Sequence, residues 1–200
     1  MKVGAWYLGD DLCEFTVWCP KSKTVTLELQ DRSVEMQPQN HGYWSAIVSE
    51  IKPKTQYRYR LETGTFPDPA SQFQPSGVHE ASAVVDHSFE WQDSQWQGVD
   101  LEDYVIYELH VGTFTPAGTF EAIIPRLQTL KDLGITAIEL MPIAQFPGDR
   151  NWGYDGAYPY AIQNSYGDAS SLKQLVEACH QHGIAVVLDV VYNHFGPEGT

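Results

Sequence analysis

The order of apolar and polar positions divides the chain into two halves with different periods. Up to about residue 97, short runs alternate apolar with polar side chains, as in Thr24–Leu29, where every second residue is apolar. A period of two gives a strand one core face and one solvent face. The clearest runs, which are separated by turn residues, are Phe15–Trp18, Val25–Leu29, Tyr43–Val48 and Tyr57–Leu61. This spacing predicts a small antiparallel β-sandwich.

From Asp103 onward, apolar strand-like runs alternate with segments of helical period. The runs are Tyr104–Val111, Ala137–Met141 and Ala185–His194, of which the last begins as an almost unbroken aliphatic stretch. Such stretches are typical of parallel strands that are buried on both faces. Between them, the apolar spacing predicts helices over 119–133, with a kink at Pro125, and over 169–182. Repeated β-α units indicate a parallel sheet with right-handed crossovers.

Three parallel strands cannot make a finished domain. A closed (β/α)8 barrel takes roughly 250 residues, and the second half of the chain offers far fewer. We therefore expect a β-sandwich domain over residues 1–97 and the N-terminal part of a barrel domain over residues 98–200. On this interpretation the sequence is an N-terminal piece of a longer protein.

The composition of the chain limits which partners it is expected to bind and in which compartment it is expected to be found. The 200 residues carry a net charge of −14, which argues against nucleic acid and anionic membranes because both are bound by Lys and Arg. The N-terminus lacks the apolar run of a signal peptide, and no stretch approaches the roughly 20 apolar residues of a membrane span. The three cysteines are odd in number and far apart, so we expect no disulfide framework. These features predict a soluble cytoplasmic protein, and the oligomeric state stays open.

Polar side chains gather where the predicted parallel strands end. The carboxyl ends of such strands are the usual place of α/β-barrel active sites, and aromatic, carboxylate and imidazole groups together suit a polar, ring-shaped ligand. Each residue also has a simpler explanation, such as a paired core carboxylate for Glu108 and Glu139 or an ordinary loop residue. The candidates are Glu108, His110, Trp152, Gly153, Tyr154, Asp155, Asp189, Asn193 and His194.

Other chemistries have weaker support. Cys179, His180 and His182 look like a metal cluster, but they lie on one helical turn and the cysteine belongs to the apolar stripe, so we expect no metal. The chain has no glycine-rich nucleotide motif and no Gly-x-Ser-x-Gly elbow, and no cofactor is expected. The aromatic residues of the first half fit core and cross-strand positions better than a sugar-stacking platform.

Several motifs resemble the α-amylase family of glycoside hydrolases. Asp189–His194 is similar to the first conserved segment of that family, and Trp152–Asp155 is similar to its tyrosine loop after the second strand. Further matching stretches carry the resemblance over essentially the whole chain and, within the family, toward the trehalohydrolases. These stretches are Tyr107–Phe114, Ile138–Pro142, Asn193–Gly199 and Asp68–His79.

The resemblance implies an immunoglobulin-like β-sandwich followed by the first three strands and two helices of an incomplete TIM barrel. It also implies site roles. Tyr154 would stack on the sugar ring next to the cleaved bond, His194 would hydrogen-bond to its hydroxyls, and Asp189 would order the rim around it. The further candidates for substrate binding are Asp155, Asn193, Trp152 and His110.

The family mechanism is retaining and uses a carboxylate nucleophile and a carboxylic acid roughly 5 Å apart. By the resemblance, the nucleophile, the acid and a third carboxylate follow later barrel strands, beyond Thr200. We therefore assign no catalytic residue, Asp189 included, and expect the chain to be inactive alone.

The resemblance leaves several hypotheses for function. The parent protein would cleave the α-1,4 bond next to the terminal trehalose of malto-oligosyltrehalose. Alternatives are a branching or debranching enzyme that acts on malto-oligosaccharides, a non-catalytic glucan-binding module, and a truncated product without a function of its own.

Overall fold

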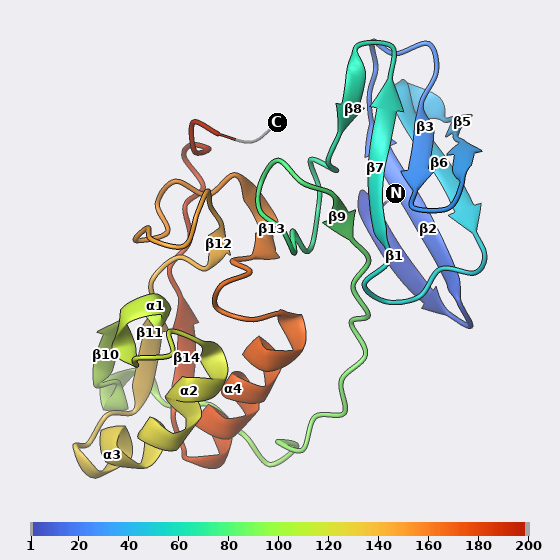
Figure 1. Ribbon diagram of the computed structural model, residues 1–200. Helices are drawn as coiled ribbons and strands as arrows, with labels where there is room; N and C mark the ends of the chain where they lie inside the picture. The colour runs from blue at the N-terminus through green and yellow to red at the C-terminus, as the bar shows by residue number, and fades with distance from the viewer. Residues whose placement is uncertain (1, 199–200) are drawn as a thin grey trace.

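Two antiparallel sheets make up the N-terminal half of the protein in a computed structural model that describes residues 2–198 (Figure 1). The first sheet has the strand order β1-β2-β6-β5, with β1 Gly4–Gly9, β2 Leu12–Trp18, β6 Tyr43–Val48 and β5 Gln37–Pro38. The second has the order β4-β3-β7-β8, with β4 Ser33–Glu35, β3 Thr26–Leu29, β7 Gln56–Leu61 and β8 Gly64–Phe66. A short strand, β9 (Ser82–Ala83), also pairs with β7. The predicted antiparallel strands are therefore present.

The core of this half lies between the two sheets and follows the predicted alternation. On β3, Leu27 and Leu29 are buried while Thr26 and Glu28 are half-buried. Phe15 of β2 meets Tyr57 of β7 edge to face, with ring centroids 5.0 Å apart. Because both tyrosines of β7, Tyr57 and Tyr59, are core residues, the interpretation of the aromatics as packing residues holds for them.

The segment after β8, which has no periodicity in the sequence, is organised around the buried carboxylate of Asp68. Tyr57 donates its hydroxyl to Asp68 Oδ2 at 2.7 Å, and the Ala70 amide donates to Asp68 Oδ1 at 2.8 Å. The Asp68 amide in turn donates to Ser82 Oγ at 3.0 Å. Burial still raises the pKa of Asp68 to about 6, although these hydrogen bonds oppose the rise.

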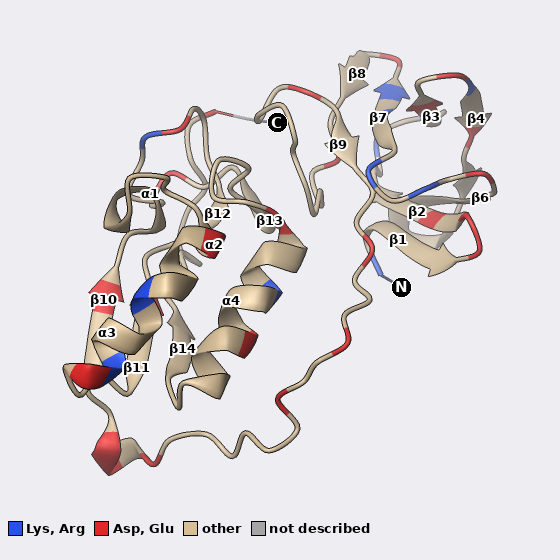
Figure 2. Ribbon diagram, turned by 60° about the horizontal axis from the view of Figure 1, so that its bottom comes forward, with Lys and Arg blue, Asp and Glu red and all other residues tan. Residues whose placement is uncertain are grey.

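A three-stranded parallel sheet forms the centre of the second half. Its order is β10-β11-β14, with β10 Ile106–Leu109, β11 Ala137–Leu140 and β14 Ala185–Leu188. Figures 1 and 2 show the helices α2 (Phe120–Ile123), α3 (Leu127–Asp132) and α4 (Ala169–Gln181) on one face of this sheet. The core between them includes Phe120, Ile138, Leu140 and Leu175.

The opposite face of the parallel sheet is open. Glu108 of β10 lies beside Glu139 of β11 in the register; Glu108 is exposed and Glu139 half-buried. At the two edges, Ile106 is 51% exposed and Leu188 is 45% exposed. The prediction that these strands are buried on both faces holds for Ala137 and Ile138 of the central strand β11, and it is wrong for the described residues of the outer strands β10 and β14.

The helix boundaries follow their sequence signals. The predicted helix over 119–133 is broken at Pro125 into α2, a 3-10 turn over Ile124–Arg126 and α3, which confirms the kink. Thr119 caps α2 by accepting a hydrogen bond from the Ala122 amide, and Gly134 adopts a φ of +90° after α3. Asp168 and Ser171 form a capping box at the start of α4.

Some elements do not follow from the sequence pattern. The long loop after β11 contains a hairpin of β12 (Ala144–Gln145) and β13 (Tyr158–Ile162), and β10 is followed at once by the one-turn helix α1 (Val111–Phe114). Short 3-10 turns also occur at Asn40–Gly42 and Leu101–Asp103. No helix within residues 2–198 is long and apolar enough to cross a membrane.

An irregular segment over residues 85–100 runs from β9 past α4 to β10 (Figure 1). His180 of α4 pairs through Nδ1 with Asp93 Oδ2 at 2.5 Å and stacks on the Trp96 ring, with centroids 4.5 Å apart. Lys173 of the same helix donates to the His87 carbonyl at 2.6 Å. These contacts fix the connecting segment against the outer side of α4.

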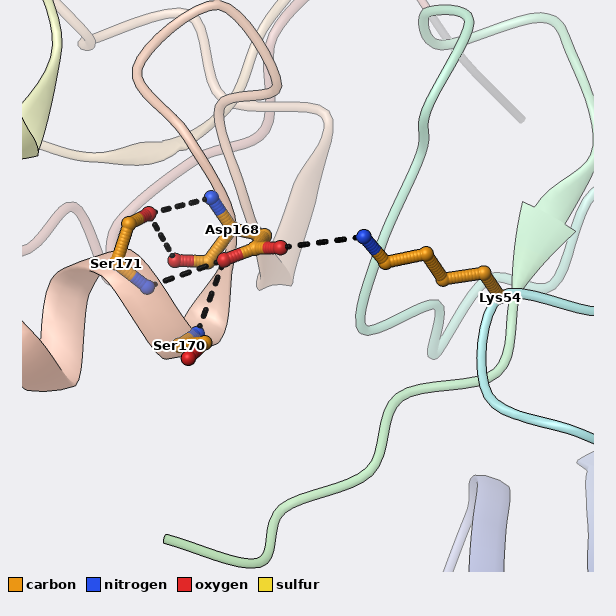
Figure 3. Close-up of polar contacts among 4 residues, drawn as sticks. All are labelled: Lys54, Asp168, Ser170 and Ser171. Carbon is orange, nitrogen blue, oxygen red and sulfur yellow. Dashed lines mark hydrogen bonds and ion pairs between the residues drawn. The ribbon is translucent and has the colours of Figure 1, made fainter.

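The two halves also touch directly. The Tyr158 hydroxyl of β13 donates to the Val78 carbonyl at 2.7 Å, and Asn164 Nδ2 donates to the Pro75 carbonyl at 3.0 Å. Figure 3 shows a third contact, in which Lys54 Nζ lies 3.7 Å from Asp168 Oδ2. The Asp68–His79 stretch therefore includes residues at the junction of the two halves.

Candidate active-site rim

Two loops meet beyond the carboxyl ends of β11 and β14. The Tyr154 hydroxyl from the first loop donates to Asp189 Oδ2 from the second at 2.7 Å. His194 Nε2 lies 2.8 Å from the Tyr154 carbonyl oxygen, to which it donates its hydrogen. Three of the predicted site residues are thus brought together, and Asp189 and His194 lie 35 and 40 positions after Tyr154 in the sequence.

The hydrogen bond to Asp189 stabilises the protonated phenol of Tyr154. It raises the pKa of Tyr154 to about 12, with a smaller contribution from burial. The phenol therefore stays protonated at neutral pH and keeps donating to the carboxylate. Because 37% of Tyr154 is exposed, part of its ring is open to a ligand.

The loop that carries Tyr154 is held by its own polar groups. Asn151 Nδ2 donates to Asp155 Oδ2 at 2.8 Å, and Asn151 Oδ1 accepts the Gly153 amide at 2.8 Å. Gly153 has a φ of +100°, and a Cβ there would lie 2.1 Å from the Pro142 carbonyl oxygen, so only glycine fits. The Asp155 carboxylate is thus engaged within the loop, whereas Trp152 is 73% exposed.

The second loop packs closely on the first. The Gly196 amide donates to the Gly156 carbonyl at 2.9 Å, and a Cβ on Gly196 would lie 2.1 Å from the Asp155 carbonyl oxygen. Asn193 lies next to His194 on this loop, with Asn193 Oδ1 3.2 Å from His194 Nδ1. Gly199, the last residue of the Asn193–Gly199 stretch, lies outside the described residues.

His110 lies under the first loop, at the end of β10. Its Nε2 is 2.7 Å from the Asn151 carbonyl oxygen and 3.0 Å from the Tyr166 hydroxyl, and its Nδ1 is 3.2 Å from Thr113 Oγ1. The tautomer that satisfies these contacts carries its hydrogen on Nε2 and accepts from Thr113 on Nδ1. Both ring nitrogens of this predicted site residue therefore already have protein partners.

Two cavities flank the Tyr154 loop. One, of about 820 Å³, lies between α1 and the loop, and its lining includes His110, Trp152 and Tyr154 together with Asp149 and Arg150. The other, of about 650 Å³, has a mainly apolar lining from β13 and the segment after β14, together with Asp189, Asn193 and His194. Asp149 and Arg150 have no recognisable sequence signal, since an exposed pair of opposite charges in a loop has no characteristic spacing.

The residues that resembled a metal cluster are spread out in the structure. Cys179 is a fully buried core residue, and burial raises the pKa of its thiol to about 12. His180 faces the connecting segment, and His182 Nδ1 donates to the Ala178 carbonyl at 2.7 Å. Over the described range, no group of three or more His, Cys, Asp or Glu side chains is arranged to hold a metal ion.

Comparison with known families agrees with this arrangement. The family described as "Alpha amylase, catalytic domain" matches residues 65–200. The chain belongs to the α-amylase family. A second family, "Carbohydrate-binding module 48 (Isoamylase N-terminal domain)", matches residues 2–74. The fold is therefore an N-terminal domain of the module 48 type followed by the start of an α-amylase catalytic domain.

The alignments with individual relatives extend over both halves of the chain. A malto-oligosyltrehalose trehalohydrolase of Saccharolobus solfataricus is 50% identical over 195 residues, which cover 96% of this chain and 35% of that protein. The 1,4-alpha-glucan branching enzyme GlgB of Pseudoalteromonas atlantica is 31% identical, over 92% of this chain and 29% of its own length. A crystal structure from Salmonella typhimurium superimposes with a TM-score of 0.94 at 44% identity, over 98% of this chain and 34% of that one. The chain thus spans about a third of the length of the relatives it matches.

Proposed function

We propose that the whole protein is a retaining glycoside hydrolase that cleaves the α-1,4 bond next to the terminal trehalose of malto-oligosyltrehalose and releases trehalose. The observation that carries the proposal is the cluster of Tyr154, Asp189 and His194 at the strand ends. The identity of 50% with a named trehalohydrolase supports the choice of reaction within the family. In this proposal the chain contributes substrate-binding groups, and none of its carboxylates is assigned to the catalytic pair that the retaining mechanism requires.

In this proposal the exposed ring face of Tyr154 stacks on the sugar next to the cleaved bond. Its hydroxyl is hydrogen-bonded to Asp189, which fixes the orientation of the ring. A ring that is already held in its bound orientation favours binding, because it loses little conformational entropy when the sugar binds. His194 keeps the loop backbone in place through the Tyr154 carbonyl and offers its ring edge to sugar hydroxyls. The proposed subsite residues around them are Asp155, Asn193, Trp152 and His110.

We further propose that β10, β11 and β14 are the first three strands of a (β/α)8 barrel, preceded by a carbohydrate-binding-like sandwich over residues 1–97. The open face with Glu108 and Glu139 supports this, because a barrel would cover it with side chains from further strands. Cytoplasmic location and the lack of nucleic-acid or membrane partners stay predictions from composition.

The experiment is to incubate the full-length protein with malto-oligosyltrehalose and to measure released trehalose. Tyr154→Ala should lower kcat/KM by roughly 10- to 100-fold because the stacking surface is lost, and Tyr154→Phe should retain much more activity. Tyr160→Ala, on the exposed side of β13, is the matched control, since Tyr160 is 64% exposed and lies in the same hairpin. A protein that releases no trehalose contradicts the proposal.

The second candidate is a branching enzyme, which the 31% identity with the Pseudoalteromonas atlantica enzyme favours. Formation of α-1,6-branched glucan from amylose, without trehalose release, would support it. A debranching enzyme ranks third and would act on existing α-1,6 branches. A non-catalytic glucan-binding module predicts heat of binding for maltoheptaose with the isolated chain and no product with any of these substrates.

A further inference from the structure

The loop of residues 146–157, which carries Tyr154, begins and ends in the β12–β13 hairpin, and this hairpin contacts residues 73–80 of the chain. We call residues 73–80 the junction stretch. We propose that the sandwich positions the Tyr154 loop through the junction stretch, with Tyr158 and Asn164 as the positioning residues. Their effect on the reaction rests on the function proposed above, whereas their effect on the loop rests on the contacts themselves.

The junction stretch is fixed to the sandwich by polar contacts. The side chain of Gln74 is fully buried and donates to the Gly77 carbonyl at 3.3 Å and to the Glu80 carbonyl at 3.2 Å. Its Oε1 accepts the Ser71 hydroxyl at 2.8 Å. The Glu80 carboxylate in turn pairs with Arg58 of β7, with the two atoms 2.6 Å apart. These contacts give the stretch a defined shape and attach it to the second sheet of the sandwich.

The β12–β13 hairpin binds this stretch with side chains from both ends of β13. The Tyr158 hydroxyl donates to the Val78 carbonyl at 2.7 Å, and the Tyr158 ring packs in a small buried cluster with Val78 and Ala161. Asn164 Nδ2 donates to the Pro75 carbonyl at 3.0 Å. A buried carbonyl that loses its donor costs free energy, so these hydrogen bonds favour one position of the hairpin on the stretch.

A network of buried side-chain amides extends from the hairpin into the Tyr154 loop. Gln145 and Gln163 are both fully buried, and Gln145 Nε2 donates to Gln163 Oε1 at 2.9 Å. Gln163 Oε1 also accepts the Phe146 amide at 3.0 Å, and Gln163 Nε2 donates to the Gly148 carbonyl at 2.9 Å. Gln145 Oε1 accepts the Asn164 amide at 3.0 Å. Satisfied buried networks of this kind are rigid, and this one links Asn164 to the first residues of the loop.

The far end of the loop has a different support. Tyr154 donates to Asp189 at 2.7 Å, and the Gly156 carbonyl accepts the Gly196 amide at 2.9 Å. The tip of the loop is therefore fixed to the segment after β14, while its base is fixed to the sandwich. A base that can shift changes the angle at which the Tyr154 ring meets a sugar, and a misplacement of about 1 Å can lower a rate by roughly 100-fold.

Hydrogen–deuterium exchange of the full-length protein, followed by mass spectrometry, tests the structural step. Tyr158→Phe removes one hydroxyl and leaves the ring in its cluster. Peptides that cover residues 146–157 should then exchange roughly fivefold faster, the factor expected for one net hydrogen bond. Peptides from β2 and β11 should exchange at the wild-type rate. Equal acceleration in all these peptides would show a general loss of stability and would overturn the proposal.

Tyr7→Phe is the matched control for this substitution. The Tyr7 hydroxyl accepts the Asp11 amide at 3.3 Å within the first hairpin of the sandwich, so the variant also loses one hydrogen bond of a half-buried tyrosine. It should leave the exchange of residues 146–157 unchanged. Loop exchange that is the same in Tyr7→Phe and Tyr158→Phe contradicts a positioning role.

Asn164→Asp provides a second variant. It keeps an acceptor for the two glutamines but places a carboxylate oxygen opposite the Pro75 carbonyl oxygen, where the donor was. Loop exchange should accelerate at least as much as in Tyr158→Phe. Asn40→Asp adds the same charge at an exposed position of the sandwich and should have no such effect. An equal response of the two Asp variants would contradict the role of Asn164.

The effect on the reaction is measured as trehalose release by the full-length protein. Tyr158→Phe should lower kcat by roughly threefold to tenfold with a smaller change in KM, because a misplaced ring weakens the transition state more than the bound substrate. Tyr7→Phe should leave both constants unchanged. Faster loop exchange together with an unchanged kcat would overturn the positioning role.

The positioning role and the proposed function can fail separately. If the wild type releases no trehalose, the proposed function is wrong, and the exchange measurements still decide whether the sandwich positions the loop. If the wild type releases trehalose and Tyr158→Phe exchanges like the wild type over residues 146–157, the positioning role is wrong and the proposed function stands.

Discussion

The sandwich and the parallel sheet differ in how completely they bury their apolar side chains. In the sandwich the inner faces of two antiparallel sheets pack on each other, and Phe15, Leu27 and Tyr57 are almost completely buried. In the second half, helices cover one face of the three-stranded sheet, while Ile106 and Leu188 remain about half exposed at its edges.

The contrast arises from connectivity. Antiparallel strands joined by short turns can fold back and close a core within about a hundred residues. Parallel strands need a crossover for each added strand, so both faces are covered only when more β-α units follow. The polar groups reflect the same difference: Asp68 in the first half is fully satisfied inside, whereas Asp189 and His194 lie at the open end of the second.

The sharpest test of this contrast places the same substitution in both halves. Leu27→Ala, in the sandwich core, should lower the free energy of unfolding by about 2–5 kcal/mol because it leaves a cavity. Leu188→Ala, at the open edge of the parallel sheet, should cost less than about 1 kcal/mol because the side chain is 45% exposed. Urea unfolding monitored by circular dichroism measures both. Equal losses at the two positions would show that the second half is closed in solution.

The next test uses the buried carboxylate of Asp68. Its folded pKa of about 6 lies above the ordinary value of 3.8, so the folded state binds more protons between these values and stability falls as pH rises through that window. The contribution amounts to about 3 kcal/mol, fully present below pH 3.8 and lost above about pH 6. Asp68→Asn, which cannot ionise, should lack this dependence.

Urea unfolding of both proteins between pH 4 and 7 tests this expectation. The wild type should be more stable relative to Asp68→Asn at the acid end than at neutral pH. A difference between the two proteins that stays constant over this range would contradict the shifted pKa. Asp86→Asn, at an exposed carboxylate of the connecting segment, is the control for a general charge effect.

A smaller effect is expected where the connecting segment joins the halves. Asp93 and His180 retain only 17% and 15% side-chain exposure, and Trp96 covers the imidazole. Asp93→Asn should cost about 1 kcal/mol, since it replaces a partly buried, charge-assisted hydrogen bond with a weaker neutral one. Residues 85–100 should then be cleaved faster in limited proteolysis. Asp100→Asn, at an exposed aspartate without a capping bond in the same segment, should leave the cleavage rate unchanged.

The smallest effects concern the contact in Figure 3, where one carboxylate has two kinds of partner. Asp168→Ala should destabilise by about 1 kcal/mol because it removes the cap of α4. Lys54→Ala should change stability by less than about 0.5 kcal/mol, since Lys54 is 76% exposed and 3.7 Å from the carboxylate. Thermal unfolding of both variants compares them. A larger loss for Lys54→Ala would mean that the two halves depend on this ion pair.

The sequence predicts much of the fold where local rules decide the outcome. The period-two runs give β3, β6 and β7, and the capping residues Thr119 and Asp168 set the starts of α2 and α4. The family motifs pointed to Tyr154, Asp189 and His194, and the structure brings these three together. Local rules did not predict α1 or the β12–β13 hairpin, because a single turn of helix and strands of two to five residues carry too little periodicity.

The sequence by itself determined the longer strands, the starts of α2 and α4 and the residue types available at the strand ends, because spacing and capping act over a few neighbouring positions. Only the tertiary structure decided which of those residues have free groups. Both ring nitrogens of His110 are engaged by Thr113, Asn151 and Tyr166, whereas part of the Tyr154 ring remains exposed. Asn151 and Tyr166 are 41 and 56 positions from His110, and hydrogen bonds over those separations depend on how the loops pack.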